Sequence, residues 1–297
     1  MIRAVFRDLI RNSFAKPPRE RTAGVFFIKR TNMESSKYKY IYGPVSSWRI
    51  GRSLGIDPIS SFQKTCTFDC IYCQSGRTEV FSCEREVFVP TDEVIRELRS
   101  VPDVAVDYIT FAGNGEPTLA KNLGEMIRAV RMVRSEKIAV ITNASLIDRK
   151  DVQQDLLLAD RVEAKLDAAS PDSFKKVNRP MFDVIFENIL QGLSGFRKIY
   201  KGQLVIQAMF TAANKAEAPR IAAMALEIRP DEIEINTPLR VSPAKPLPPE
   251  DIAEITAIFR KACGDRIKVR SVYEAKLEES RPFSRPATER RRGKENL

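Results

Sequence analysis

At residues 66–73 the chain reads Cys66-Thr67-Phe68-Asp69-Cys70-Ile71-Tyr72-Cys73. The three cysteines follow one another with the spacing C-x3-C-x2-C, and the aromatic Tyr72 precedes the last of them. A loop this short can bring three thiolates around one metal centre, but the next cysteine, Cys83, lies ten residues further on. Three thiolates on a [4Fe–4S] cluster leave one iron with an open coordination position, where a small molecule can bind. The stretch therefore predicts a reactive iron–sulfur cluster.

Two other roles for these cysteines are less consistent with the composition. A structural zinc site normally has four Cys or His ligands, and the chain has no histidine, so Cys83 or Cys263 would have to complete it. A disulfide framework conflicts with an odd number of cysteines, five, in a chain of 297 residues with no recognisable signal peptide. We expect Cys83 and Cys263 to be ordinary buried thiols. A non-catalytic iron–sulfur or zinc-binding protein is the alternative to a reactive cluster.

The composition is that of an ordinary globular protein, with 43% hydrophobic and 30% charged residues. The sequence has no run of about 18 apolar residues, so it predicts no transmembrane helix and no membrane partner, and we expect a cytoplasmic protein. The net charge of +10 comes from the two ends, because residues 33–280 hold 35 residues of each sign. Basic ends can attract nucleic acid, but solvated tails are the simpler expectation.

The charge distribution divides the chain into three parts. Residues 1–37 form a basic N-terminal extension that we expect to be poorly ordered. It is compatible with an Arg-rich transit peptide, or with a non-native extension before a functional start at Met33. Residues 38–280 form the main domain, and residues 281–297 form a basic C-terminal tail.

The main domain alternates between expected strands and helices. Residues 42–56 are rich in Gly and Ser and resemble a loop, and the first expected strand, 54–60, leads into the cysteine stretch. The later expected strands are 108–111, 137–142, 161–166, 204–210, 232–236 and 267–272. One expected helix starts at Thr91. The others span 123–133, 148–158, 183–199, 216–228 and 249–262. About six β/α units predict an α/β fold, a partial (β/α)6 TIM-like barrel with its ligand at the carboxyl ends of the strands.

Polar residues follow several of these strands and are candidates for the site. The glycines of Gly113-Asn114-Gly115-Glu116 allow the backbone to approach a ligand closely. The alternative is that they are present only because a turn needs their conformational freedom. Asn143 ends the third strand, where a plain helix-start turn is the alternative. Glu163, Lys165 and Asp167 share one strand face, either as a buried ion-pair network or as part of an active site. Gln207 and Asn236 are further hydrogen-bonding candidates. Without histidine, acid–base work falls to Asp, Glu, Lys, Tyr or Cys.

The cysteine spacing, with Tyr72 before the last cysteine, resembles the radical S-adenosylmethionine (SAM) superfamily. Residues 113–116 resemble the "GGE" turn of that family, with Asn114 in place of one glycine. Over about residues 38–275 the chain looks like a poorly characterised subgroup, distantly akin to the wyosine-base synthases of tRNA. The further stretches that carry this likeness are Gly43-Pro44-Val45-Ser46, Gly51-Arg52-Ser53-Leu54-Gly55-Ile56, Gly115-Glu116-Pro117-Thr118-Leu119 and Val177-Asn178-Arg179-Pro180.

The resemblance implies a fold, two cofactors and roles for particular residues. The fold would be the partial barrel of the radical SAM type, in which Cys66, Cys70 and Cys73 ligate a [4Fe–4S] cluster. The fourth iron would take the amino and carboxylate groups of SAM. The SAM-binding residues would be Tyr72, Gly113, Asn114, Gly115, Glu116, Asn143, Lys165, Gln207 and Asn236. Lys165 and Asp167 are the candidates for catalytic groups.

The implied reaction is reductive cleavage of SAM to a 5′-deoxyadenosyl radical, which abstracts hydrogen from an unknown substrate. The implied partners are SAM, that substrate and an electron donor such as flavodoxin or ferredoxin. A tRNA base, a protein partner as in activating enzymes, and a small metabolite are the competing substrate classes.

Overall fold

The computed structural model describes residues 37–276 and 278–292. The prediction for residues 1–37 therefore falls almost entirely outside the described residues. The strands are β1 (Ile41–Ser47), β2 (Gly51–Ile56), β3 (Thr65–Cys66), β4 (Val80–Phe81), β5 (Tyr108–Phe111), β6 (Lys137–Thr142), β7 (Arg161–Lys165), β8 (Gln203–Met209), β9 (Glu232–Asn236) and β10 (Lys268–Ser271). The helices are α1 (Thr91–Arg99), α2 (Leu123–Arg131), α3 (Lys150–Leu156), α4 (Pro171–Val177), α5 (Phe186–Ile199), α6 (Ala218–Ile228), α7 (Pro249–Cys263) and α8 (Arg285–Arg292).

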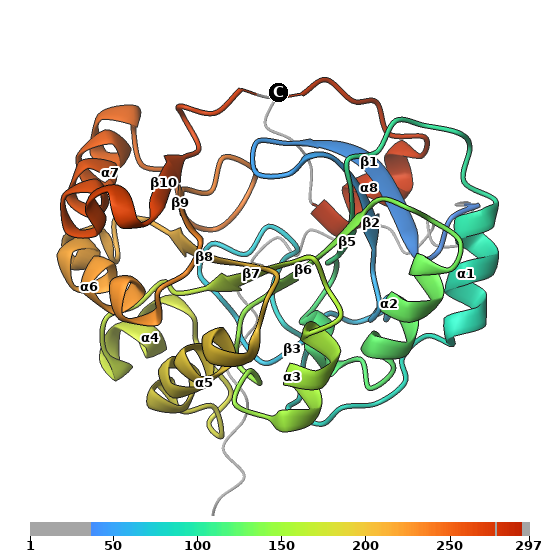
Figure 1. Ribbon diagram of the computed structural model, residues 1–297, viewed down its shortest axis with the longest axis horizontal. Helices are drawn as coiled ribbons and strands as arrows, with labels where there is room; N and C mark the ends of the chain where they lie inside the picture. The colour runs from blue at the N-terminus through green and yellow to red at the C-terminus, as the bar shows by residue number, and fades with distance from the viewer. Residues whose placement is uncertain (1–36, 277, 293–297) are drawn as a thin grey trace, which may run out of the picture. The chain divides into compact units, whose positions relative to one another are not determined.

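Eight of the strands form one curved sheet in the order β1-β2-β5-β6-β7-β8-β9-β10. β1 is antiparallel to β2, and every other neighbouring pair is parallel. Helices α1–α3 and α5–α7 lie along the outer face of this sheet (Figure 1). This arrangement confirms the predicted partial barrel. Because the parallel strands run in one direction, their carboxyl ends gather the loops that follow them at one rim.

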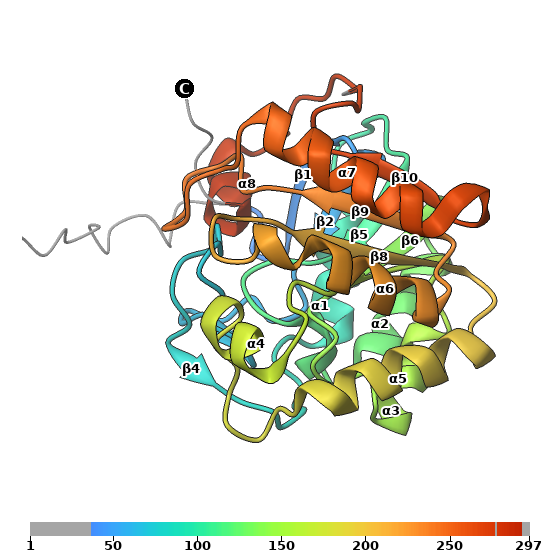
Figure 2. The same cartoon turned by 90° about the vertical axis from the view of Figure 1, so that its left-hand side faces the viewer.

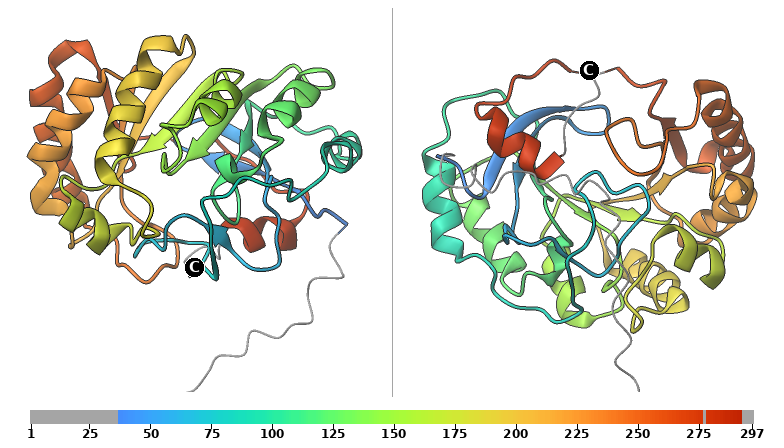
Figure 3. Two further views of the ribbon diagram at one scale, coloured as in Figure 1. Left: turned by 90° about the horizontal axis from the view of Figure 1, so that it is seen from below. Right: turned by 180° about the vertical axis from the view of Figure 1, so that it is seen from behind.

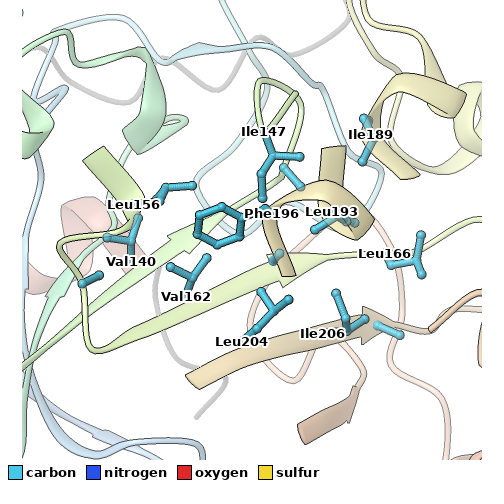
Figure 4. Close-up of a cluster of buried hydrophobic side chains, with 14 of the residues drawn as sticks. Val140, Ile147, Leu156, Val162, Leu166, Ile189, Leu193, Phe196, Leu204 and Ile206 are labelled. Carbon is cyan, nitrogen blue, oxygen red and sulfur yellow. The ribbon is translucent and has the colours of Figure 1, made fainter. Parts of the chain in front are cut away.

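The core between the sheet and its helices explains why the apolar strands fold this way. Val140, Val162 and Leu204 come from three neighbouring strands, β6 to β8, and each is fully buried. Phe196 of α5 packs over them (Figure 4). Burying one such side chain stabilises the fold by about 1.5–3 kcal/mol. The burial of α5 against these strands therefore holds the helix on the outer face of the sheet.

The strand β1 and the helix α4 were not predicted from the sequence. Residues 42–56, expected to be mainly a loop before the strand at 54–60, form the hairpin of β1 and β2. β1 is stabilised by pairing with β2, which the Gly- and Ser-rich sequence does not reveal. The short helix α4 was also missed. Its start is encoded by Ser170, which accepts a hydrogen bond from the Ser173 amide, and by Pro171 in the first turn.

The C-terminal segment differs from its predicted role as a solvated tail. Residues 285–292 form α8, which packs against β1 (Figure 3). Arg291 is only 3% exposed and its Nε lies 3.2 Å from an Asp57 carboxylate oxygen. The guanidinium also lies over the Tyr42 ring, 5.7 Å from its centroid. The sequence pattern failed here because the helix is held by charge pairing with the barrel and has only a few apolar residues.

No helix in the described ranges is long and apolar enough to cross a membrane.

We predict that Arg291→Met destabilises the protein by about 3–5 kcal/mol, because it leaves the buried Asp57 carboxylate without its cation. The free energy of unfolding, measured by chemical denaturation, checks this. Arg96→Met is the control, since its ion pair with Asp92 is exposed and is worth about 0.5 kcal/mol or less. Equal, small losses in the two variants would show that α8 is not anchored by this ion pair.

Candidate functional site

The cysteine stretch lies at the carboxyl-end rim, where a second segment holds it in place. Cys66 is in β3, which pairs with β4, and the other two cysteines lie in the loop between these strands. Residues 177–181, at and beyond the end of α4, run alongside this loop, and Figure 2 shows α4 and β4 at the same end of the domain. Three backbone hydrogen bonds join the two segments: Asp69 N to Arg179 O (3.1 Å), Ile71 N to Val177 O (2.9 Å) and Met181 N to Thr67 O (2.8 Å).

Each of the three cysteine sulfurs accepts a hydrogen bond from a different side chain. Lys64 Nζ lies 3.0 Å from Cys73 Sγ. Asn143 Nδ2, after β6, lies 3.6 Å from Cys66 Sγ. Asn178 Nδ2, at the end of α4, lies 3.6 Å from Cys70 Sγ. Hydrogen bonds to the sulfurs stabilise the thiolate form that binds iron.

Burial acts against that thiolate form. It raises the pKa of Cys66 to about 11, and it raises the pKa of Cys70 as well. Burial also lowers the pKa of the Lys64 ammonium, but the neighbouring cysteines outweigh this effect and the net pKa is raised. A bound metal centre is the natural counterpart of such thiols, because metal binding releases their protons.

The donor set fits a cluster better than a single ion. Within residues 37–276 and 278–292, no three Cys, Asp or Glu side chains converge on a point that one metal ion could occupy. A cubane places each thiolate on a different iron, which requires a wider arrangement. Cys263 is buried in α7, and Cys83 contacts Met181 through sulfur at 3.6 Å. The structure therefore does not bring either cysteine in as a fourth zinc ligand.

The glycine turn after β5 packs directly against the cysteine segment. Gly115 has a φ of +154°, and a Cβ there would lie 2.2 Å from the Thr65 carbonyl oxygen. A Cβ on Gly113 would lie 2.3 Å from the Asp57 carboxylate carbon, and Asp57 also accepts a hydrogen bond from the Asn114 amide at 3.2 Å. These close contacts require glycine and bring the turn beside the strand that carries Cys66.

Glu116 is buried at the end of this turn, and its carboxylate accepts hydrogen bonds that hold the turn in place. Its carboxylate takes hydrogen bonds from the Thr142 hydroxyl (2.6 Å), the Asn143 amide (2.7 Å), and the Thr118 amide (3.1 Å) and hydroxyl (2.7 Å). Burial raises its pKa, and these hydrogen bonds act in the opposite direction. Glu116 thus fixes the turn to the end of β6, and both of its oxygens are engaged within the protein.

A second network joins four of the predicted residues. Asp167 accepts hydrogen bonds from the Tyr72 hydroxyl and from Met209 N (2.7 Å). Lys165 Nζ lies 3.2 Å from Asp167, 2.6 Å from Gln207 Oε1 and 5.0 Å from the centroid of the Tyr72 ring. Burial raises the pKa of the Tyr72 hydroxyl, and the Asp167 charge raises it further. Tyr72 therefore stays protonated and orients Asp167.

The other two predicted residues on the strands have different surroundings. Glu163 is fully buried, forms an ion pair with Arg49, and accepts a hydrogen bond from Gln207 Nε2 at 3.1 Å. The Glu163/Lys165/Asp167 face is thus a buried ion-pair network that extends to the rim. Asn236 ends β9, and its side-chain oxygen accepts a hydrogen bond from the Thr237 amide at 2.9 Å. This contact stabilises the loop that follows β9.

A pocket of about 530 Å³ lies beside the cysteine loop. Cys70 and Cys73 line it together with two exposed basic side chains, Arg77 and Arg179. Asp69 lies between these arginines, 3.5 Å and 3.8 Å from them. The pocket gives a solvent-facing approach to the cysteines.

The residues that sequence reasoning missed include Asp57, Lys64, Asn178 and Arg291. Two of them carried a signal. Lys64 is a cation two residues before Cys66, and Asn178 lies in the Val177–Pro180 stretch that carries part of the family resemblance. The roles of the others depend on contacts between distant segments.

The fold and the site define the class of protein. A model of the radical SAM superfamily matches residues 60–225, and the chain belongs to that superfamily. It is therefore a radical SAM enzyme, and its cofactors are a [4Fe–4S] cluster and S-adenosyl-L-methionine. Among its relatives, UPF0026 protein slr1464 from Synechocystis is 40% identical over 210 residues, which cover 70% of this chain and 79% of the relative.

Solved structures share the fold at low sequence identity. Streptococcus suis SuiB bound to S-adenosylmethionine aligns with a TM-score of 0.55 and 16% identity, covering 70% of this chain and 48% of SuiB. The chain thus spans about half the length of that protein. TYW1 with a lysine–pyruvate adduct bound aligns with a TM-score of 0.53 and 18% identity, covering 71% of this chain and 73% of TYW1.

We predict that Glu116→Gln lowers the free energy of unfolding by about 1–3 kcal/mol, because the amide NH2 would face a donor that the carboxylate now satisfies. Chemical denaturation measures the change. Glu125→Gln on the exposed face of α2 is the matched control and should be nearly neutral. If Glu116→Gln were as stable as the control, the carboxylate would not be what fixes the turn.

Proposed function

We propose that the chain holds a [4Fe–4S] cluster on Cys66, Cys70 and Cys73 and cleaves SAM reductively, producing a 5′-deoxyadenosyl radical that abstracts hydrogen from its substrate. The observation that carries this proposal is the position of the three thiols. They lie at the carboxyl-end rim, each sulfur within hydrogen-bond distance of a donor, directly beside a glycine turn.

The residues around the cysteines would bind and orient SAM. Gly113, Asn114 and Gly115 would offer backbone groups to the methionine part. Because the Glu116 carboxylate is engaged by Thr118, Thr142 and Asn143, Glu116 would act by fixing the turn. The polar groups that face the rest of the cofactor would be Tyr72, Asn143, Lys165, Gln207 and Asn236.

Lys165 and Asp167 are the proposed catalytic groups. They lie together at the end of β7, with Lys165 held by Asp167 and Gln207, and Asp167 held by the Tyr72 hydroxyl. A lysine placed in this way can donate a proton or orient a polar group of the substrate, and the Asp167 carboxylate holds it in position.

The proposed electron donor is an acidic protein such as flavodoxin or ferredoxin, which would approach the pocket bordered by Arg77 and Arg179. Nucleic acid remains a less favoured partner. Part of the basic C-terminal segment, Arg291, is buried against Asp57 and is not available to RNA.

Cys70→Ala is predicted to abolish both cluster binding and SAM cleavage, because two thiolates cannot replace the three-cysteine set. After anaerobic reconstitution, the native protein should hold about four irons per chain and release 5′-deoxyadenosine only with a reductant such as dithionite. Cys83→Ala is the control and should keep both properties, since Cys83 lies outside the cysteine set.

A Cys70→Ala protein that still cleaved SAM would contradict the proposal. One zinc per chain with no brown chromophore would instead support the alternative of a non-catalytic zinc-binding protein.

The substrate class can be found with the same assay. RNA, protein and small-metabolite fractions of a cell extract, added separately, should differ in the 5′-deoxyadenosine that they release, because hydrogen abstraction couples cleavage to the correct substrate. Stimulation by the RNA fraction that is lost at high salt would indicate a tRNA base. Stimulation by the protein or metabolite fraction would indicate an activating enzyme or a metabolic enzyme.

A further inference from the structure

Lys64 is a buried cation placed against one cysteine of the site. The residue is 4% exposed and directly precedes β3. Its Nζ lies 3.0 Å from Cys73 Sγ and 2.8 Å from the Gly76 carbonyl oxygen. A buried ammonium is costly unless it is paired with a negative group.

The pairing of Lys64 differs from that of two other cations at the rim that are buried or half-buried. Lys165 has Asp167, and Arg291 has Asp57. In the part of the chain that the structure describes, Lys64 forms no ion pair with a carboxylate, and the ionisable groups that act on it are the thiols of Cys66, Cys70 and Cys73. The negative charge that balances Lys64 must therefore come from the cysteines and what they bind.

We propose that Lys64 is the counterion of the cysteine-bound cluster and raises its reduction potential through the Cys73 sulfur. This inference rests on the proposed function, since it requires the cluster on these three cysteines. Reduction adds one electron and so adds negative charge, which a buried cation in contact with a ligand sulfur stabilises.

The other two sulfur contacts provide the comparison within the site. Asn143 and Asn178 donate to Cys66 and Cys70 through neutral amide groups at 3.6 Å. Lys64 donates from a full positive charge at a shorter distance. Charge-assisted hydrogen bonds are roughly twice as strong as neutral ones. Lys64 should therefore dominate the electrostatic effect of the three donors and make electron entry into the site easier.

The test is the midpoint potential of the reconstituted protein, measured without SAM by a redox titration followed by electron paramagnetic resonance (EPR). Lys64→Met removes the charge and the hydrogen bond, Lys64→Gln keeps a donor without charge, and Lys64→Arg keeps the charge. We expect Met and Gln to lower the equilibrium constant for one-electron reduction at least tenfold, a shift of about 59 mV to more negative potential. Arg and the exposed control Lys198→Met should retain the native midpoint.

The outcomes separate this inference from the proposed function. A native protein that binds no iron would overturn the proposed function itself. Iron-loaded Met and Gln variants with the native midpoint would overturn only the role of Lys64. If Met and Gln lose iron and Arg retains it, the requirement for a positive charge supports the counterion. If all three variants lose iron, charge is not the property that matters, and the inference fails.

Discussion

The backbone pairing between the cysteine loop and residues 177–181 is the constraint on which the site depends. A loop with three reactive thiols has no regular structure of its own, and these hydrogen bonds give it one. The same pairing brings the Asn178 side chain to Cys70 and to Asp167, 2.9 Å away. Asn178 thus joins the loop to the end of β7, as the Tyr72 hydroxyl also does, and links the cluster site to the proposed catalytic groups.

Pairs of buried charges are the second feature that holds the segments of the site in place. The inner face of the barrel carries paired ions, such as Arg161 with Glu234 at 2.6 Å. Each buried charge requires an opposite charge from another strand or loop, because a buried charge without a partner is strongly destabilising. At the rim the same rule holds for Asp57, whose cation comes from the C-terminal helix. The charges therefore fix the relative positions of segments that share few apolar contacts.

The sequence predicted those features that depend on local pattern. β6 and β9 have the predicted bounds, since β6 is a largely apolar run and β9 alternates isoleucine with polar residues, each between turn signals. The three cysteines were singled out by their spacing and the glycine turn by its position after a strand, and the structure places the two segments side by side. β1 and α8 were missed because tertiary pairing stabilises them. The contacts of Asn178 and Arg291 were also unpredictable, since Asn178 reaches Cys70 across 108 positions and Arg291 reaches Asp57 from the far end of the described chain. Position after a strand does indicate the rim, and nearly all candidate residues lie there.

The central claim is that the three cysteines hold a cluster whose remaining iron is open to SAM. The EPR spectrum of the reduced, reconstituted protein, recorded with and without SAM, tests it most directly. An open iron beside the glycine turn predicts that SAM changes the spectrum of the cluster. A cluster whose spectrum is identical with and without saturating SAM, or a protein that assembles no cluster, would contradict this account.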